Sequence, residues 1–220
     1  GCWRFAGDTV VQPGRHSHWG FEMGYVQPDH QGSELASVNW LEPTGGRVGL
    51  LLGTLVETTQ GWRRVEDLMV GTEVYPYDGG LRPAVRVRRL TVRCQGNVVV
   101  RIPGGVGNVC QDLFVQAQQY LMVGPDGGFD FSHGQGSLCQ AKYLCGHRQI
   151  GLARYSRGKA LVSLTFAEEE LIYANTGALV HCSGLLSEGT TTNYFPVMRE
   201  AVFDRSAGEL PSTSIAEPAD

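Results

Sequence analysis

The sequence predicts an all-β protein. Short runs of β-branched and aromatic residues recur along the chain, and glycine- or proline-rich turns separate them. The chain contains 30 glycines and 10 prolines in 220 residues, a content that is typical of many tight turns. Because 42% of its residues are hydrophobic and 18% are charged, it matches an ordinary globular domain that can bury a core.

Strands are expected where apolar residues alternate with polar ones or form a short continuous run. In chain order these runs are Val48–Val56, Glu73–Tyr77, Val85–Val92, Val98–Ile102, Leu113–Val115, Tyr120–Val123, Ala160–Phe166 and Leu171–Ala174. Turn sequences such as Asp78-Gly79-Gly80 and Pro103-Gly104-Gly105 separate them. The segment Ser137–Cys145 is the best helical candidate, but it is too short to change the fold class.

Composition divides the chain into three regions. We expect residues 1–46 to form a β-rich arm, residues 47–184 to form the main domain, and residues 185–220 to form an extension. Beyond Ser206 this extension is rich in Pro, Ser and Glu, a composition typical of a tail. The arm contains Trp3, Trp19 and Trp40. Because large aromatic side chains are favoured at interfaces, we expect the two ends to make contacts with partners.

The charge pattern argues against a nucleic-acid-binding protein. The formal net charge is −4, whereas such binding requires a basic surface. Arg86 and Arg88 alternate on one face of an expected strand, and a solvated strand face is the preferred interpretation. No apolar run of about 18 residues is present, so no membrane-spanning segment is expected. The sequence shows no signal-peptide pattern, and it leaves localisation open.

The six cysteines do not form a recognisable metal motif. They occupy positions 2, 94, 110, 139, 145 and 182, and no Cys-x-x-Cys is present. Cys139 and Cys145 are the only closely spaced pair, and they leave a disulfide open as an alternative. The preferred interpretation is that the cysteines are buried as small apolar side chains.

His16, His18 and Glu22 form a candidate metal site. Their spacing, His-x-His-x(3)-Glu, resembles the first metal motif of the cupins, and these side chains could coordinate a transition metal. The second cupin motif, Pro-x-Gly-x-x-His, is missing. Surface histidines in a glycine-rich loop are therefore the preferred interpretation, and no cofactor is expected.

The segment between Gly49 and Gly80 carries the most specific pattern in the chain. It contains Gly53-Thr54, then Val65-Glu66-Asp67-Leu68, then Asp78-Gly79-Gly80. This order resembles the opening of bacterial Hint (Hedgehog/intein) domains, which read Cys-Phe-x-x-Gly-Thr, Val-Glu-Asp-Leu and Asp-Gly-Gly. The resemblance covers residues 47–184 and implies a Hint-like fold of short strands with two pseudo-symmetric halves.

The resemblance also implies that the catalytic groups have been lost. Hint domains begin with a cysteine that attacks the preceding peptide bond, and Gly49 stands in its place. Their Leu-x-Val-Ser-Pro-Gln-His run aligns from Leu113, so that Gln119 replaces a histidine and cannot exchange a proton near neutral pH. Their His-Glu-Val-x-x-Ala-Asn-Gly run aligns from Glu169, which replaces a second histidine.

We therefore expect a catalytically inactive Hint-like domain that acts as a structural or interaction module. The resemblance implies a bacterial extracellular or phage-like assembly, with other protein subunits as partners. One alternative is residual self-cleavage through Cys2, and the other is the cupin-like metal site. The run Val180-His181-Cys182-Ser183 is similar to the end of inteins but lacks the asparagine that cyclises. A strand-end histidine beside a core cysteine is the preferred interpretation there.

Overall fold

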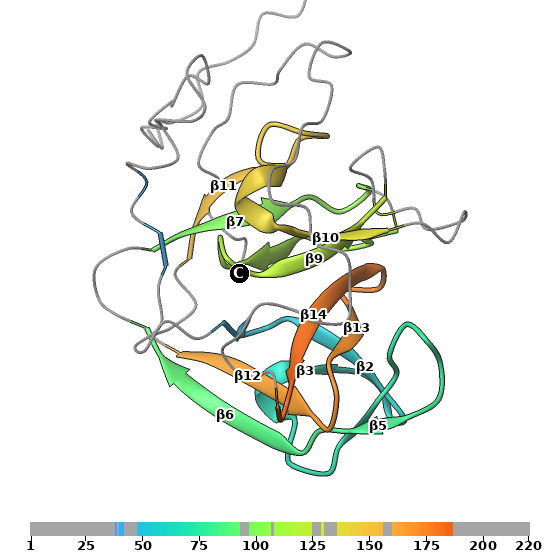
Figure 1. Ribbon diagram of the computed structural model, residues 1–220. Coiled ribbons are helices and arrows are strands. Elements are labelled where there is room, and N and C mark those ends of the chain that lie inside the picture. The colour runs from blue at the N-terminus through green and yellow to red at the C-terminus, as the bar shows by residue number, and fades with distance from the viewer. Residues whose placement is uncertain are drawn as a thin grey trace, which may run out of the picture.

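The protein is built from short strands, and the all-β prediction is confirmed (Figure 1). The computed structural model describes residues 38, 40–41, 48–92, 97–106, 108–124, 129, 136–155 and 160–186. The strands are β1 (Leu50–Leu51), β2 (Leu55–Thr58), β3 (Gly61–Arg64), β4 (Glu73–Val74), β5 (Arg82–Pro83), β6 (Arg86–Thr91), β7 (Val98–Ile102), β8 (Leu113–Val115), β9 (Tyr120–Val123), β10 (Ser137–Gln140), β11 (Gly151–Arg154), β12 (Ala160–Phe166), β13 (Glu170–Ala174) and β14 (Ala178–Gly184). In this part of the chain the helical elements are single 3₁₀ turns, η1 (Val65–Asp67) and η2 (Ala141–Leu144).

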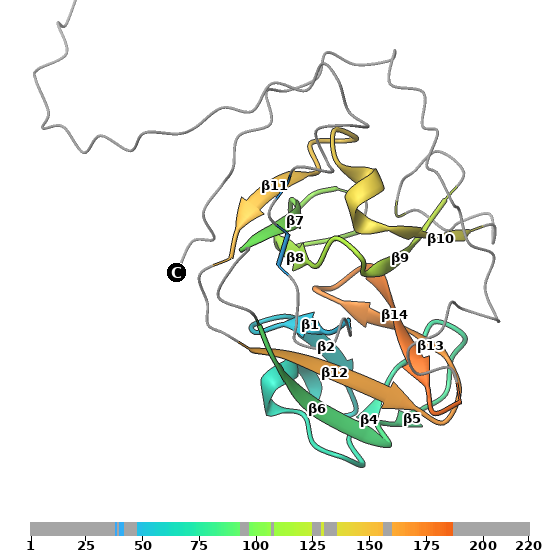
Figure 2. The same ribbon diagram turned by 60° about the vertical axis from the view of Figure 1, so that its left-hand side comes forward.

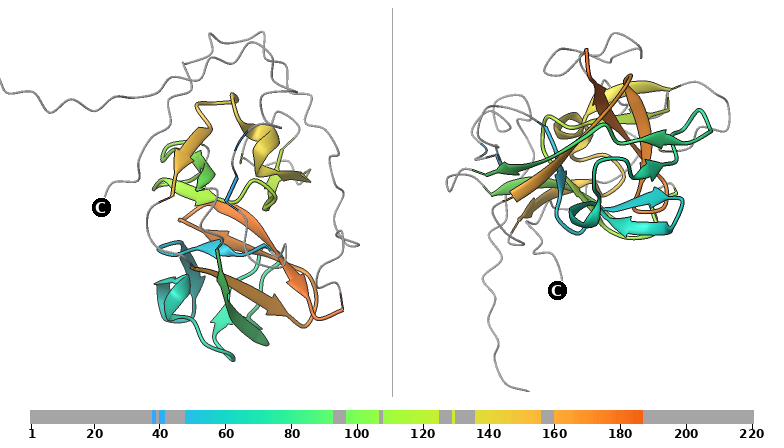
Figure 3. Two further views of the ribbon diagram at one scale, coloured as in Figure 1. Left: turned by 90° about the vertical axis from the view of Figure 1, so that its left-hand side faces the viewer. Right: turned by 90° about the horizontal axis from the view of Figure 1, so that it is seen from below.

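Two sheets organise these strands. The larger, 11-stranded sheet follows the order β1-β12-β14-β13-β2-β4-β5, and β3, β6, β9 and β10 branch from this path. The smaller sheet has three strands in the order β11-β7-β8. Figure 2 shows the small sheet at one end of the molecule and β6 at the other, with β14 between them. The left view in Figure 3 shows the same arrangement from another side, and the right view looks along the molecule from the β6 end.

Strand β12 is central to the larger sheet. It pairs with β1 and β6 in antiparallel fashion and with β14 in parallel. Its buried side chains include Leu161, Leu164 and Phe166, because a strand with neighbours on both edges and faces presents a nearly continuous apolar run. Leu164 and Phe166 belong to the main core cluster, which also takes in side chains of β7, β8 and β9. The two sheets therefore share one core.

Most of the expected strands lie where the sequence placed them. Val98–Ile102, Leu113–Val115, Tyr120–Val123 and Ala160–Phe166 have the expected bounds, and β13 begins one residue earlier than expected, at Glu170. The expected strand Val48–Val56 is interrupted, because Gly53 adopts a φ of 87° and the chain turns between β1 and β2.

The helical prediction for Ser137–Cys145 was wrong. Its first half is the strand β10, which pairs with β9 from Ser137 opposite Val123 to Gln140 opposite Tyr120. Its second half is the single turn η2. The local sequence is ambiguous, and pairing with β9 buries Leu138 and Cys139 on the sheet.

The end of the expected amino-terminal arm packs against the main domain. Trp40 forms an isolated parallel bridge with Val98, and the Leu41 N–H donates a 2.9 Å hydrogen bond to the Val98 carbonyl. The Leu41 side chain is 3% exposed and joins a second core cluster with Leu51 and Leu161. Leu41 therefore packs against the region expected to form the main domain.

Two further expectations concern β6 and membranes. Arg86 and Arg88 lie opposite Thr165 and Ser163 of β12, so they share a face of β6 as expected.

Among the described residues, no helix is long and apolar enough to cross a bilayer.

Candidate functional site

Gly49 lies immediately before β1, against the start of β12. The register pairs Leu50 with Val162, which brings the β12 backbone beside residue 49. A Cβ atom on Gly49 would lie 3.1 Å from the Val162 carbonyl oxygen and 3.2 Å from the Leu161 Cβ. These separations are shorter than ordinary van der Waals contacts, so the absence of a side chain at position 49 is part of how β1 packs.

Gln116 holds the Gly49 amide in place, and the sequence analysis did not identify this residue. Its Oε1 accepts a 2.8 Å hydrogen bond from the Gly49 N–H, and its Nε2 donates a 3.3 Å bond to the Leu41 carbonyl. The side chain is buried, with the residue 1% exposed, so both amide ends are satisfied inside the protein. One signal was available, since Gln116 occupies the serine position of the run that begins at Leu113.

Gln119 lies at the far end of the turn that Gln116 begins. The Gln119 N–H donates a 3.1 Å hydrogen bond to the Gln116 carbonyl and closes this turn. The Gln119 Nε2 donates to the His181 carbonyl at 2.8 Å and to the Tyr120 carbonyl at 3.1 Å. Because both side-chain N–H groups have backbone acceptors, the amide ties the turn to β14. The turn therefore has Gln116, which binds Gly49, at one end and Gln119 at the other.

Glu169 and His181 form an almost fully buried pair. The Glu169 Oε2 lies 3.5 Å from the His181 Nε2, and the side chains are 5% and 9% exposed, respectively. The Tyr120 ring meets the imidazole edge-on at 6.3 Å between centroids. Burial lowers the pKa of His181, and the Glu169 carboxylate opposes that shift. His181 is the second residue whose role the sequence analysis missed, because it lies in the middle of β14 and not at a strand end as expected.

These contacts connect the three predicted positions in one continuous chain of hydrogen bonds and side-chain contacts. They run from Gly49 through Gln116 to the turn, then from Gln119 to the His181 backbone and from its imidazole to Glu169. Gln116 is neutral, and at the Gly49 nitrogen it accepts a hydrogen bond. It therefore cannot deliver the proton that a departing backbone amine needs.

The described thiols are poor candidates for a replacement nucleophile. Cys139 and Cys182 are buried and free, as expected for small apolar side chains. Burial raises the pKa of Cys139 to about 11 and that of Cys182 to about 12, so both remain protonated near neutral pH. Cys110 is free and exposed, which differs from the expectation of burial. Its backbone N–H donates to the turn residue Thr176 at 3.1 Å.

The residues next to the site that match the family pattern support backbone turns. The Glu66 carboxylate accepts a 2.8 Å hydrogen bond from the Gly53 N–H, which fixes the turn between β1 and β2. The Val65 N–H donates to the Thr54 carbonyl at 2.8 Å. Val65-Glu66 and Gly53-Thr54 therefore contact each other, although 12 residues separate Gly53 from Glu66 in the sequence.

Asn175 performs a similar task at the hairpin between β13 and β14. Its Oδ1 accepts a 2.8 Å hydrogen bond from the Leu55 N–H, and its Nδ2 donates a 2.8 Å bond to the Asp112 carbonyl. Its φ of 43° is left-handed, a conformation that asparagine tolerates better than most residues. One side chain thus joins β2, the segment before β8 and the hairpin turn.

The alternative sites can be placed only in part. His16, His18, Glu22 and Cys2 lie outside the described residues. Within the described residues, no cluster of three or more His, Cys, Asp or Glu side chains is arranged to hold a metal ion.

Comparison with known proteins gives one family and a set of distant structures. The family model described as "Hint domain" matches residues 48–180. No curated protein sequence matches the chain. A splice-inactive variant of the AceL NrdHF class 3 split intein is similar in structure, with 12% identity, a TM-score of 0.40, and coverage of 61% of this chain and 97% of that chain. A bacterial intein-like domain from Clostridium thermocellum gives 11% identity, a TM-score of 0.40, and coverage of 61% and 98%. The MchDnaB-1 intein gives 15% identity, a TM-score of 0.39, and coverage of 59% and 98%.

Proposed function

Because this chain belongs to the Hint domain family, we propose that it is a member that no longer cuts its own backbone and serves as a structural or interaction module. The observation that carries this proposal is the absence of a side chain at position 49. Gly49 has no attacking atom, and a Cβ there would crowd the Val162 carbonyl at 3.1 Å. Nucleophilic cleavage of the Val48–Gly49 bond requires a side chain at that position.

The division between retained and altered residues supports the proposal. Glu66 and Asn175, which match the family pattern, bind backbone groups that hold turns in place. Gln119, which departs from the pattern, now binds two backbone carbonyls and has no proton to exchange near neutral pH. A chain that requires the fold but not self-cleavage would keep the residues that support turns and change the residues at the catalytic positions of the family pattern.

The test is the integrity of the Val48–Gly49 bond. The purified chain is incubated with dithiothreitol or hydroxylamine, which intercept thioesters, and its intact mass is recorded over time. We expect the uncut mass throughout. A fragment that ends at Val48 would instead support residual autoprocessing. The same experiment on a Cys2→Ser variant would show whether Cys2 takes part in any cleavage that is seen.

We place this module in a bacterial extracellular or phage-like assembly, with other protein subunits as partners. Residues 1–46 and 185–220 are proposed to add contacts with partners to those of the main domain. The net charge of −4 supports protein rather than nucleic-acid partners. Size-exclusion chromatography of the chain from its native source tests this placement. We expect elution with other proteins, unchanged by nuclease treatment, and elution as a monomer would contradict it.

A further inference from the structure

An exposed tryptophan and a glutamate lie side by side on the outer face of the β2–β3 hairpin. Glu57 pairs directly with Trp62 in the antiparallel register, so their side chains point to the same side. The neighbouring Val56 and Thr58 are buried, which means that Glu57 faces away from the core. Trp62 is 37% exposed, a large fraction for an indole ring.

Tyr75 extends this row on the other edge of β2. The register pairs Thr58 with Val74, and the Tyr75 N–H donates a 3.1 Å hydrogen bond to the Glu57 carbonyl. Tyr75 is 39% exposed, whereas its neighbour Val74 is buried, so the phenol ring also lies on the outer face. Glu57 therefore has an aromatic residue on each side.

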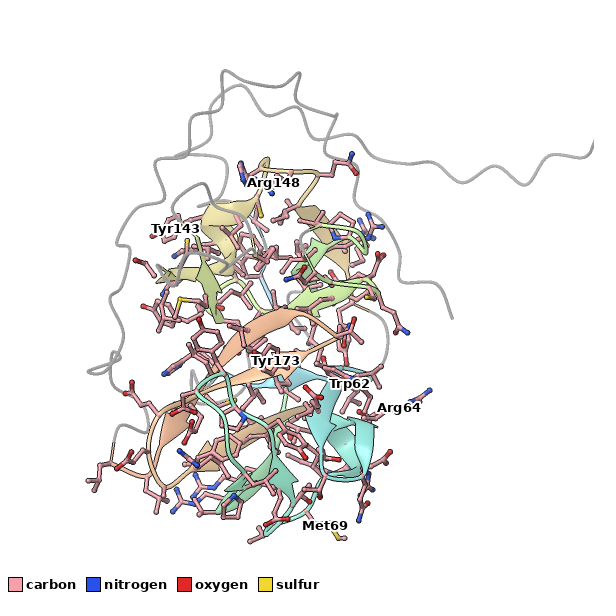
Figure 4. The ribbon with its side chains drawn as sticks, turned by 90° about the vertical axis from the view of Figure 1, so that its right-hand side faces the viewer. Trp62, Arg64, Met69, Tyr143, Arg148 and Tyr173 are labelled. Carbon is pink, nitrogen blue, oxygen red and sulfur yellow. The ribbon has the colours of Figure 1, made fainter. Side chains whose placement is uncertain are left out.

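Tyr173 borders the same row from β13. It directly precedes Ala174, which pairs with Val56 next to Glu57. Burial raises the pKa of Tyr173, and the neighbouring Tyr77 and Glu57 raise it further, so the phenol stays neutral close to the carboxylate. Figure 4 shows Trp62 and Tyr173 on the same face of the molecule. We call Glu57, Trp62, Tyr75 and Tyr173 the aromatic–acidic face.

The carboxylate of this face has no ionic partner within the described part of the chain. Among the described residues, no hydrogen bond or ion pair engages the Glu57 carboxylate. Arg64 follows Trp62 on the same side of β3, but it pairs with Leu55 in the register and forms no ion pair with Glu57. A half-buried carboxylate between aromatic rings is thus left available to a positive charge.

We propose that the aromatic–acidic face binds an arginine side chain of a protein partner. A guanidinium is attracted to the faces of tryptophan and tyrosine rings, and it also makes charge-assisted hydrogen bonds to a carboxylate. Its planar group stacks on aromatic rings better than a lysine ammonium does. Tryptophan, tyrosine and arginine are also the residues that contribute most often to interface energy.

The charge of the face disfavours other occupants. An apolar partner would bury the Glu57 carboxylate without a counter-charge, which is costly. A phosphate-rich partner would be repelled by Glu57 and by Glu73, which alternation places on the same side as Tyr75. This inference deepens the proposed interaction role, because it states the chemistry of the partner.

The test follows the Trp62 indole N–H signal by NMR while N-acetyl-arginine amide is added to the full chain. We expect a saturable shift at roughly millimolar ligand, the range for a single side chain. The citrulline analogue, which has the same shape without the charge, should give no saturable shift. Equal responses to both ligands, or no response to arginine, would overturn the proposal.

Variants identify the residues responsible. Glu57→Gln should weaken arginine binding about two- to fivefold, as should Tyr75→Leu, read from the same indole signal. Arg64→Gln is the matched control, because it removes a neighbouring cation and should leave binding unchanged or tighter. Amide spectra that keep their dispersion show that each variant is folded.

A shift that depends on protein concentration alone would identify a second copy of this chain as the occupant and would overturn the proposal. Intact mass of the same sample separates the two proposals, because a cut at Val48 contradicts only the proposed loss of cleavage.

Discussion

Gly49 shows how the absence of a side chain can become a packing requirement. The β1–β12 pairing brings the Val162 carbonyl within 3.1 Å of the place a Cβ would occupy. At the same time Gln116 accepts the Gly49 N–H and fixes the backbone from the other side. Glycine is therefore the residue that this close approach admits without a shift of β12.

We predict that Gly49→Ala destabilises the protein. The added methyl group forces β1 and β12 apart by a few tenths of an ångström, and such overpacking costs about 1–3 kcal/mol in free energy of unfolding. Urea denaturation of the variant and the parent chain measures the difference. Equal denaturation midpoints for the two chains would show that β12 shifts at no cost in stability and that a cysteine could be accommodated at position 49.

Asn175 is the second residue that is important for packing, because its small side chain binds two separate backbone segments. It binds one backbone N–H and one backbone carbonyl on separate segments, both at 2.8 Å. We predict that Asn175→Ala lowers the free energy of unfolding by about 2–4 kcal/mol, because the Leu55 N–H and the Asp112 carbonyl lose their partner. The control is Asn97→Ala at an exposed site, where the expected change is within about 0.5 kcal/mol. Similar losses in both variants would contradict the structural role of Asn175.

At the scale of the element, β14 connects the site to the rest of the larger sheet. It pairs with β13 along its length, with β12 at its end and with β9 at Val180. Its residue His181 carries an imidazole that is buried beside Glu169. A titratable group in a central strand makes the stability of the sheet depend on pH.

We predict that the protein loses stability as the pH falls below about 6.5, the ordinary pKa of histidine. The pKa of His181 is lowered by burial in the folded protein, so the unfolded chain takes up the proton first and is favoured in acid. The His181→Gln variant should show a smaller loss between pH 8 and 5 in thermal melting. Glu170, whose pKa is raised mainly by burial, contributes equally to both chains and cancels in the difference. Parallel pH profiles would contradict this assignment.

At the scale of the whole molecule, residues outside the region that carries the family pattern pack against that region. Leu41 is buried in the second core cluster, and its carbonyl accepts a hydrogen bond from Gln116. Trp40 also forms a bridge with Val98 of β7 in the small sheet. Trp40 and Leu41 therefore help to join the small sheet to the site.

We predict that a chain beginning at residue 48 is less stable than a chain beginning at residue 38. The shorter chain loses the buried Leu41 side chain, for which truncation to alanine typically costs about 2–5 kcal/mol, and it leaves the Gln116 amide without one acceptor. Thermal melting of the two chains measures the difference. Identical melting temperatures would show that Leu41 adds nothing to the fold.

The sequence by itself determined the strands whose signal is local. Val98–Ile102 and Ala160–Phe166 were predicted with their observed bounds, because a run of β-branched and apolar residues favours extended backbone wherever it lies. The sequence also determined the family, since Gly53-Thr54 and Val65-Glu66 build turns that need those residue types at that spacing. The loss of the nucleophile at Gly49 remains a prediction from the same pattern.

Only the tertiary structure decided the elements and contacts that depend on distant residues. Ser137–Gln140 is a strand because β9 lies beside it, and its own sequence does not choose between helix and strand. Gln116 reaches Gly49 across 67 positions, and Gln119 reaches the His181 carbonyl across 62. Such partners are set by how the sheets pack and not by local propensity. The physical reason is that a buried amide or carboxylate takes whatever hydrogen-bonding group the fold brings to it.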